Sequence, residues 1–179
     1  MKKFLKIFGI TSLVLTIILG CLFWWWAGFS YSTSSRYYAQ MSNSEFYSLP
    51  TIESLPKHES VKYKYFNDRM GIFDSKAYTM IVEYDEDTYK AQKNSVYEPF
   101  EEIEEIFIGY QPEELKRNTS PIELDGFSFE MFSRDFPKII YFVGTNDETN
   151  EIAYILYEDH DLDSVSVPYS TFIDQYCGW

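Results

Sequence analysis

An uncharged apolar segment near the N-terminus constrains this chain more than any other feature. Twenty consecutive residues, from Ile7 to Trp26, contain no charged side chain. A helix rises about 1.5 Å per residue, so this segment spans roughly 30 Å, the thickness of the hydrocarbon core of a bilayer. The hydrophobic region of a signal peptide is usually shorter, about 7–15 residues. We therefore predict a retained transmembrane helix at residues 7–28, preceded by a short basic cytoplasmic end at residues 1–6.

Two motifs at the end of this segment favour different anchors. Trp24, Trp25 and Trp26 extend the apolar run, and tryptophan concentrates at the headgroup level, so these are the expected membrane-interface residues. Residues 18–21, Ile-Leu-Gly-Cys, resemble the lipobox of bacterial lipoproteins, whose cysteine is lipidated after the signal peptide is removed. On that alternative the signal ends before Cys21, and Cys21 carries the lipid. A lipidated cysteine is normally followed by a polar tether, whereas here Leu-Phe-Trp-Trp-Trp follows, so the retained helix is favoured.

The charges that flank the segment predict its orientation. Lys2, Lys3 and Lys6 precede it, and the first basic residue beyond it is Arg36. Positively charged flanks remain on the cytoplasmic side of a membrane. We therefore expect a single-pass protein of a bacterial cell membrane, with its N-terminus in the cytoplasm and its C-terminal domain outside. Both anchors lead to the same compartment.

The rest of the chain is strongly acidic. Residues 30–179 carry 12 basic and 28 acidic side chains, a difference of −16, and they have about the length of one domain. Such a domain repels nucleic-acid phosphates, so no nucleic-acid partner is expected. Anionic headgroups would repel it too, so we expect it to stand off the membrane surface. Because the acids are spread along the chain, the charge predicts solubility more than a specific site.

Hydrophobic periodicity predicts an α+β domain after the apolar segment. Alternation of apolar and polar side chains is typical of strands, and apolar residues at helical spacing are typical of helices. Predicted strands cover residues 60–66, 76–84, 126–132, 138–144 and 151–158, and predicted helices cover 85–107, with a break near Pro99, and 167–176. This order, ββα-βββα, predicts a two-layer domain in which an antiparallel sheet of about five strands carries helices on one face.

Composition predicts where the domain begins and where its turns lie. Residues 57–179 hold the predicted strands and long helices and form the expected extracytoplasmic domain. Residues 29–56 are rich in serine and lack a clean period, so we expect a stalk or linker with a short helix near residues 36–42. Residues 67–71 have turn chemistry, and residues 145–150 are the clearest hairpin signal.

One acidic cluster has a spacing that could hold a divalent ion. Asp159, Asp161 and Asp163 follow the 1-3-5 pattern of a calcium loop, and His160 between them is a further candidate ligand or base. The rest of that pattern is missing, because serines stand where the loop has glycine and glutamate. These four residues are the candidate metal ligands, but the incomplete pattern predicts neither a metal nor a cofactor.

The sequence does not identify an activity. It has no glycine-rich phosphate loop and no nucleophile motif, so no catalytic residue is predicted. Cys177 is expected to be a small apolar residue of the last helix. We expect a non-enzymatic domain, anchored in the membrane through residues 7–28, that binds a protein or another component of the cell envelope. The alternative is a membrane-tethered hydrolase or divalent-ion-dependent domain that uses the acidic cluster at residues 159–163.

Overall fold

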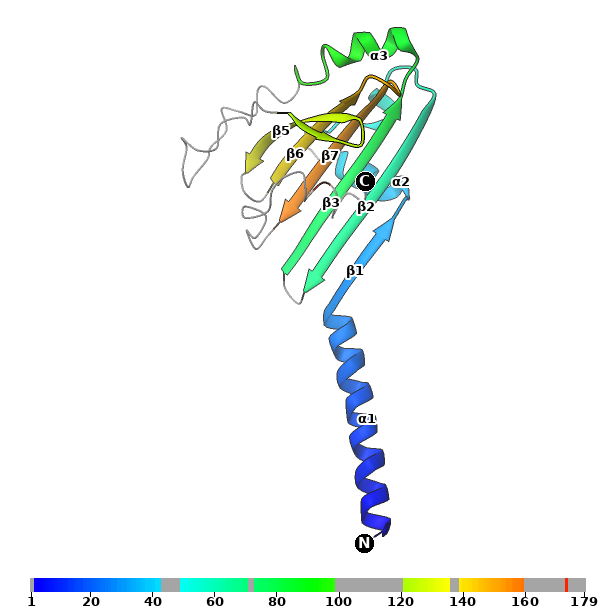
Figure 1. The fold of residues 1–179 in the computed structure, drawn as a ribbon, viewed down its shortest axis with the longest axis vertical. Coiled ribbons are helices and arrows are strands. Elements are labelled where there is room, and N and C mark those ends of the chain that lie inside the picture. The colour runs from blue at the N-terminus through cyan, green and yellow to red at the C-terminus, as the bar shows by residue number, and fades with distance from the viewer. Residues whose placement is uncertain are drawn as a thin grey trace.

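The structure consists of a long N-terminal helix joined to a seven-stranded antiparallel sheet (Figure 1). The computed structural model describes residues 2–42, 49–70, 73–98, 121–135, 139–159 and 173. Helix α1, Lys2–Trp26, projects from one end of the sheet as a rod. Two short helices, α2 and α3, accompany the sheet, together with a 3₁₀ turn at Ile52–Ser54. The prediction of an apolar N-terminal helix followed by an α+β fold with an antiparallel sheet is confirmed.

The sheet contains two strands that the sequence did not indicate. Its order is β1-β2-β3-β7-β6-β5-β4, so β7, the last strand that the structure describes, lies in the centre, between β3 and β6. All five predicted strands are present, but β1 and β4 raise the count to seven, so the expectation of about five is wrong. The strands are β1 Ala27–Ser32, β2 Ser60–Met70, β3 Phe73–Glu83, β4 Ile122–Leu124, β5 Phe127–Asp135, β6 Ile139–Asn146 and β7 Glu151–Asp159.

Part of the expected stalk contributes to the sheet and its cover. Strand β1 pairs with β2 along its whole length, from Ala27 opposite Met70 to Ser32 opposite Tyr65. Helix α2, Ser35–Ser42, then packs against β2 and β3 and buries Tyr38, which is 1% exposed. The short helix expected near residues 36–42 is therefore confirmed, and it lies on the sheet instead of in a free linker.

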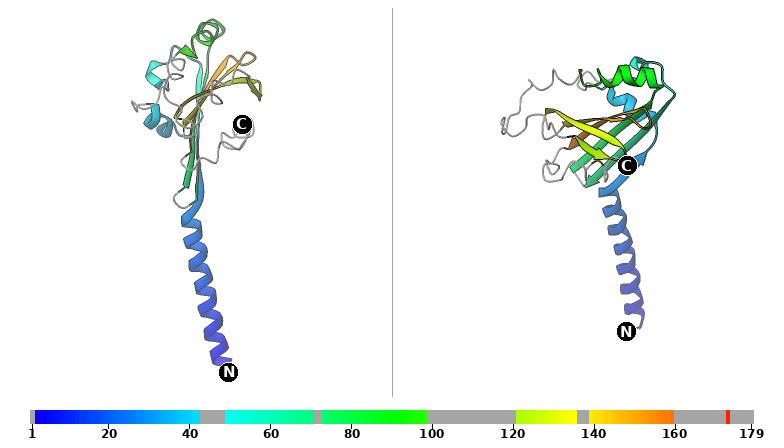
Figure 2. Two further views of the ribbon diagram at one scale, coloured as in Figure 1. Left: turned by 90° about the vertical axis from the view of Figure 1, so that its left-hand side faces the viewer. Right: turned by 45° about the horizontal axis from the view of Figure 1, so that its top comes forward.

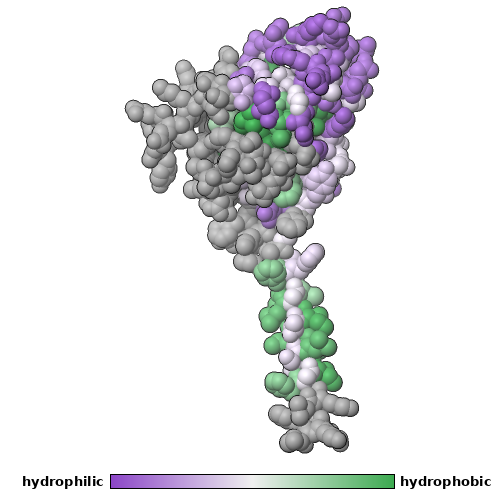
Figure 3. Space-filling model, in the orientation of Figure 1, coloured by the Kyte–Doolittle hydropathy of each residue, from purple (hydrophilic) through white to green (hydrophobic). Residues whose placement is uncertain are grey.

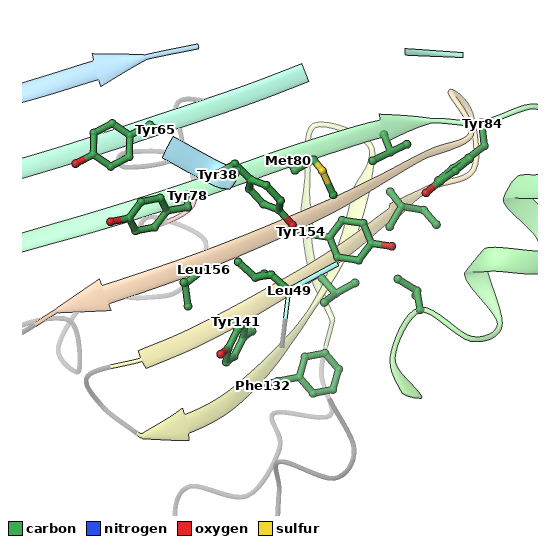
Figure 4. Packing of buried hydrophobic residues seen from close by; sticks show 14 of the residues in the cluster. Tyr38, Leu49, Tyr65, Tyr78, Met80, Tyr84, Phe132, Tyr141, Tyr154 and Leu156 are labelled. Atoms are coloured by element: carbon green, nitrogen blue, oxygen red, sulfur yellow. The ribbon is translucent and has the colours of Figure 1, made fainter. Parts of the chain in front are cut away.

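A tyrosine-rich layer covers one face of the sheet (Figure 4). Because side chains alternate between the faces of a strand, cross-strand partners from β2, β3, β7 and β6 meet on this side. The Tyr37 ring from α2 stacks on that of Tyr65 with 4.1 Å between centroids, and Tyr38 lies within the same layer. Figure 2 shows α2 on one side of the sheet. The main buried members are Tyr38, Tyr65, Tyr78, Met80, Tyr84, Tyr141, Tyr154 and Leu156.

The opposite face buries a second apolar cluster. Its centre contains Phe129, Phe142 and Ile155, each 0% exposed. Ile173, from the helix predicted at residues 167–176, is helical and equally buried in this cluster. The other residues of that predicted helix lie outside the described residues. Both faces of the sheet therefore bury side chains, and the described helices α2 and α3 contribute to the tyrosine-rich face. The expectation that helices lie on one face stays a prediction.

Helix α3, Glu86–Lys93, begins where its sequence predicts. The Asp85 side chain caps the helix and accepts a hydrogen bond from the Thr88 backbone N–H at 2.9 Å. Two acids occupy the first turn and two lysines the last, which suits the helix dipole. The helix ends well before residue 107, and residues 99–120, including the break expected at Pro99, lie outside the described residues.

The two expected turns have different outcomes. Residues 67–70 do not form a turn, because they continue β2 and pair with β3 up to Met70 opposite Phe73. The predicted hairpin at residues 145–150 is confirmed, with Asn146 and Glu151 as the last pair of β6 and β7. The Asn146 side chain closes that turn by accepting backbone hydrogen bonds at 3.0 and 3.3 Å.

Candidate membrane anchor and the sheet ends

Helix α1 has the length and surface of a membrane span. Residues Ile7–Trp24 form an uncharged stretch of 18 residues, and none of it is buried against the rest of the chain. Figure 3 shows the resulting apolar surface along the rod. A signal sequence near the N-terminus has the same properties, so both anchors considered above fit this helix. Its exposed large apolar side chains are Ile7, Phe8, Ile10, Leu13, Val14, Leu15, Ile17, Ile18, Leu19, Leu22, Phe23 and Trp24.

Two threonines within the helix have their hydroxyl groups satisfied locally. The Thr11 hydroxyl donates to the Ile7 carbonyl at 2.9 Å, and the Thr16 hydroxyl donates to the Ser12 carbonyl at the same distance. An unpaired hydroxyl in hydrocarbon is costly, whereas these bonds need no water. The two threonines are therefore compatible with a lipid environment.

The aromatic residues and the cysteine lie close together at the end of α1. Cys21 is exposed within the unbroken helix, and Trp24, one turn later, is 83% exposed. Trp25 and Trp26 are the last two residues of the helix. If the chain were cut before Cys21, only residues 22–26 would separate that cysteine from β1. Both anchors therefore place the sheet directly beside the attachment point.

The junction between anchor and sheet contains no linker. Helix α1 ends at Trp26 and strand β1 begins at Ala27 (Figure 1). Ala27 pairs with Met70, which in turn pairs with Phe73, so the ends of three strands meet at this point. We call this the anchor end of the sheet. Sequence reasoning missed it, although the alternation of Ala, Phe and Tyr with small residues over Ala27–Ser32 was an available signal.

The opposite end of the sheet is rich in charge. This far end comprises α3, the β6–β7 turn and the ends of β2 and β3 beside them (Figure 1). Its surface is the most hydrophilic part of the view in Figure 3. Acidic side chains outnumber basic ones there, so the far end carries a negative excess. The acids are Glu59, Glu83, Asp85, Glu86, Asp87, Asp147, Glu148 and Glu151, and the bases are Lys57, Lys62, Lys90 and Lys93.

A hydrogen-bonded network fastens α3 to the β6–β7 turn. The Asp147 carboxylate accepts from the Tyr89 hydroxyl at 2.7 Å and from the Lys93 ammonium at 2.6 Å. The hydrogen bond from Lys93 is the main cause that holds the pKa of Asp147 below its usual value. Burial raises the pKa of Tyr89, so its hydroxyl stays protonated and remains a donor. This network holds the far end together.

The buried tyrosines behave as core residues. The Tyr38 hydroxyl donates to the Pro50 carbonyl at 3.1 Å, which ties α2 to the segment that follows it. Burial raises the pKa of Tyr84 to about 12, and it also raises the pKa of Tyr154. These phenols stay neutral near pH 7 and do not supply a base there. Their aromatic surface fills the layer beneath α2.

The candidate metal ligands are mostly outside the described residues. Asp159 ends β7 and pairs with Ser75 of β3, which places its backbone toward the anchor end. His160, Asp161 and Asp163 lie outside the described residues, as does Cys177. Within the residues that the structure describes, no group of three or more His, Cys, Asp or Glu side chains is placed so that it could hold a metal ion. The divalent-ion hypothesis at residues 159–163 therefore stays a prediction.

Comparison of the chain with protein-family models, with curated proteins and with solved structures gave no match. Function is therefore inferred from the chain's own features: the exposed apolar helix, its direct junction with the sheet, and the contrast between the two ends.

Proposed function

We propose that this chain is a single-pass membrane protein that holds an α+β binding domain at the outer face of the cytoplasmic membrane. The observation that carries this proposal is the direct continuation of α1 into β1. A domain joined in this way has no flexible linker between it and the membrane helix. It presents one end to the bilayer and the other to the surroundings, which suits a module that meets a partner at a fixed height.

The proposed orientation rests on the positive charge at the N-terminus. Lys2, Lys3 and Lys6 favour a cytoplasmic N-terminus. The far end of the sheet then faces away from the membrane with its negative excess. We expect its partner, a protein or another envelope component, to present a basic surface, because complementary charge steers association.

Cysteine accessibility in intact cells tests the orientation. The Glu148→Cys variant, in a chain that also carries Cys21→Ala and Cys177→Ser, should react with a membrane-impermeant maleimide. The Lys3→Cys variant is the matched control and should react only after the membrane is permeabilised. The reverse pattern would show that the domain faces the cytoplasm. Radiolabelled palmitate incorporation into wild type and Cys21→Ala separates the two anchors, because label that depends on Cys21 would overturn the retained helix.

Photo-crosslinking in native membranes tests the binding role. A photoreactive amino acid in place of Asp87 or Glu148 should give one defined adduct, and raised salt should weaken it. The matched control replaces Tyr31, which is 59% exposed but lies near the anchor. Equal adducts at all three positions, or none at the far end, would contradict a partner bound there.

A further inference from the structure

Strand β1 forms one edge of the sheet and has a free side. All six of its residues pair with β2, and among the residues that the structure describes no other strand pairs with it. Figure 1 shows β1 along the margin of the sheet, directly after α1. In an edge strand, every second residue points its backbone N–H and C=O away from the sheet. Strand β1 therefore offers a row of hydrogen-bonding groups to a further strand.

The two edges of the sheet differ in their protection against pairing with another chain. Proteins protect edge strands by making them very short or by placing charges or prolines on them. Strand β4, at the opposite edge, has three residues, and the middle one is the exposed Glu123. Strand β1 has six residues, Ala-Gly-Phe-Ser-Tyr-Ser, without a charge or a proline, and its Ser30 and Tyr31 are exposed. The longer edge is therefore the one that lacks protection.

The part of the chain around β1 does not share the negative charge of the rest. Residues 27–70 contain five basic and four acidic side chains, a balance of +1. Residues 71–179 contain seven basic and 24 acidic side chains, a balance of −17. A partner at β1 therefore need not be basic, in contrast to a partner at the far end.

The direction of β1 limits which chain can pair with it. Every strand pair in the sheet is antiparallel, so an added strand that continues the pattern runs opposite to β1 and ends beside Ala27, at the membrane. Two copies anchored in one membrane cannot pair in this way. Strand β1 runs away from the anchor, and β4, at the other edge of seven alternating strands, runs in the same direction. The added strand therefore comes from a different protein.

We infer that β1 binds an extended extracytoplasmic segment of a second membrane protein, about six residues long, which lies directly before a membrane span of that protein. This inference rests on the proposed role of α1 as a membrane anchor. The segment adds a strand beside β1 through backbone hydrogen bonds, and its alternate side chains supply specificity. Gly28, Ser30 and Ser32 lie on one face of β1, and their small side chains leave space there for larger side chains of the added strand.

Photo-crosslinking of the full-length chain in native membranes tests the contact and its direction. A photoreactive amino acid replaces Ser30 or Ser32 in turn, and mass spectrometry identifies the residue that each captures. Both should capture the same membrane protein, just before one of its membrane spans. The residue captured from Ser32 should precede the one captured from Ser30 by about two positions, because the strands are antiparallel. The reverse order would overturn the inference.

The adduct at β1 should also be distinct from one at the far end. Backbone hydrogen bonds hold the added strand, so its adduct should persist at raised salt, whereas an adduct at Glu148 should weaken. The protein captured at β1 should differ in mass from the one captured at Glu148. Loss of the β1 adduct at raised salt would mean a contact held by charge, which contradicts strand addition.

Matched variants separate strand addition from other contacts. With the probe at Ser32, Ser30→Lys should reduce the adduct several-fold, because a lysine on an edge strand opposes pairing with another strand. Ser30→Thr leaves β1 uncharged and should keep the adduct. Gln40→Lys adds the same charge on the exposed surface of α2 and should keep it too. Equal adducts in all three variants would overturn the inference.

The identity of the captured chain and its extraction from membranes separate the ways in which this inference can fail. Capture of another segment of the same molecule, or of a second copy, would overturn it. A chain that resists alkaline extraction but gives no adduct at Ser30 or Ser32 would overturn the contact at β1 and leave the anchor intact. A chain that alkaline treatment releases from membranes would overturn the anchor itself, and the inference with it.

Discussion

At its anchor end the sheet continues into a helix, whereas at its far end it is closed by a turn and a capped helix. The anchor end is held by backbone pairing between the ends of three strands, Ala27 with Met70 and Met70 with Phe73. The far end is held by side chains, chiefly the Asp85 cap and the contacts of Asp147. The two ends therefore differ in what a single substitution can change. Side-chain replacements should alter the far end, whereas the backbone pairing at the anchor end does not depend on one side chain.

The largest expected effect tests whether the two ends share one core. Phe129 is 0% exposed, and its ring lies against Gly144, where an added Cβ would approach within 2.4 Å. Phe129→Ala should cost about 3–5 kcal/mol of unfolding free energy, because it leaves a cavity in that packing. Hydrogen exchange on the full-length chain should then show faster exchange in β1 and α3 together. Glu148→Ala, on the exposed turn, is the control and should change stability by less than about 0.5 kcal/mol.

If α3 kept its protection in Phe129→Ala while β1 lost it, the ends would be separate folding units. The anchor end and the far end would then belong to two domains, and not to one cooperative sheet.

The next effect concerns the anchor alone. Leu15 lies in the middle of the uncharged stretch and is 58% exposed. Leu15→Arg should disfavour insertion by about 2.5–3.5 kcal/mol, roughly a hundredfold in the insertion equilibrium. The fraction of protein that resists alkaline extraction from membranes should fall accordingly, while Leu15→Phe should behave as wild type. Unchanged retention of Leu15→Arg would mean that α1 is not what holds the chain in the membrane.

The parts of the fold that could be predicted are those with strong local patterns. Tyr78, Met80 and Val82 alternate with Thr79, Ile81 and Glu83, and this alternation indicated β3. Asp85 preceding Glu86 and Asp87 indicated the start of α3 in the same way. Ala27–Ser32 was missed because it directly follows the apolar segment, so its short alternation was interpreted as the end of a helix and the beginning of a stalk.

Other features depend on tertiary pairing that no local pattern contains. Residues 67–70 have turn chemistry, yet they continue β2 because β1 and β3 flank them and together offer backbone partners on both sides up to Met70. Strand β4 has only three residues, too few for a period to be detected. The anchor end itself could not be foreseen, since it exists only through the register that sets Ala27 opposite Met70.

Removal of the side chain that caps α3 should lower the unfolding free energy by a smaller amount. Asp85→Ala removes the acceptor for the Thr88 backbone N–H and should cost about 0.5–2 kcal/mol, because that donor loses its partner. The loss should be confined to the far end, so hydrogen exchange should rise in α3 while β1 and the first residues paired with it stay unchanged. Asp87→Ala is the matched control, since Asp87 is exposed in the first turn without capping it. Faster exchange at the anchor end in Asp85→Ala would show that the two ends are coupled through more than the core.

The smallest expected effect is a pH dependence of the stability that the Asp147–Lys93 contact gives to the far end. The Lys93 hydrogen bond holds the folded pKa of Asp147 below the ordinary value of 3.8, so the stabilisation is fully present above pH 3.8 and is lost as the pH falls through the folded pKa. Because both partners are largely solvent-exposed, Lys93→Met should cost less than about 1 kcal/mol at pH 7. The stability difference between wild type and Lys93→Met should therefore be constant between pH 5 and pH 8, which lies above that window, and should shrink below it.

Lys90→Met is the matched control, because its partner Glu86 belongs to the same helix. It should weaken α3 without loosening the β6–β7 turn, as measured by hydrogen exchange at Asn146–Glu151. A pH-independent difference for Lys93→Met would assign its role to packing of the lysine stem, and the far end would then be held by the Tyr89 hydroxyl more than by charge.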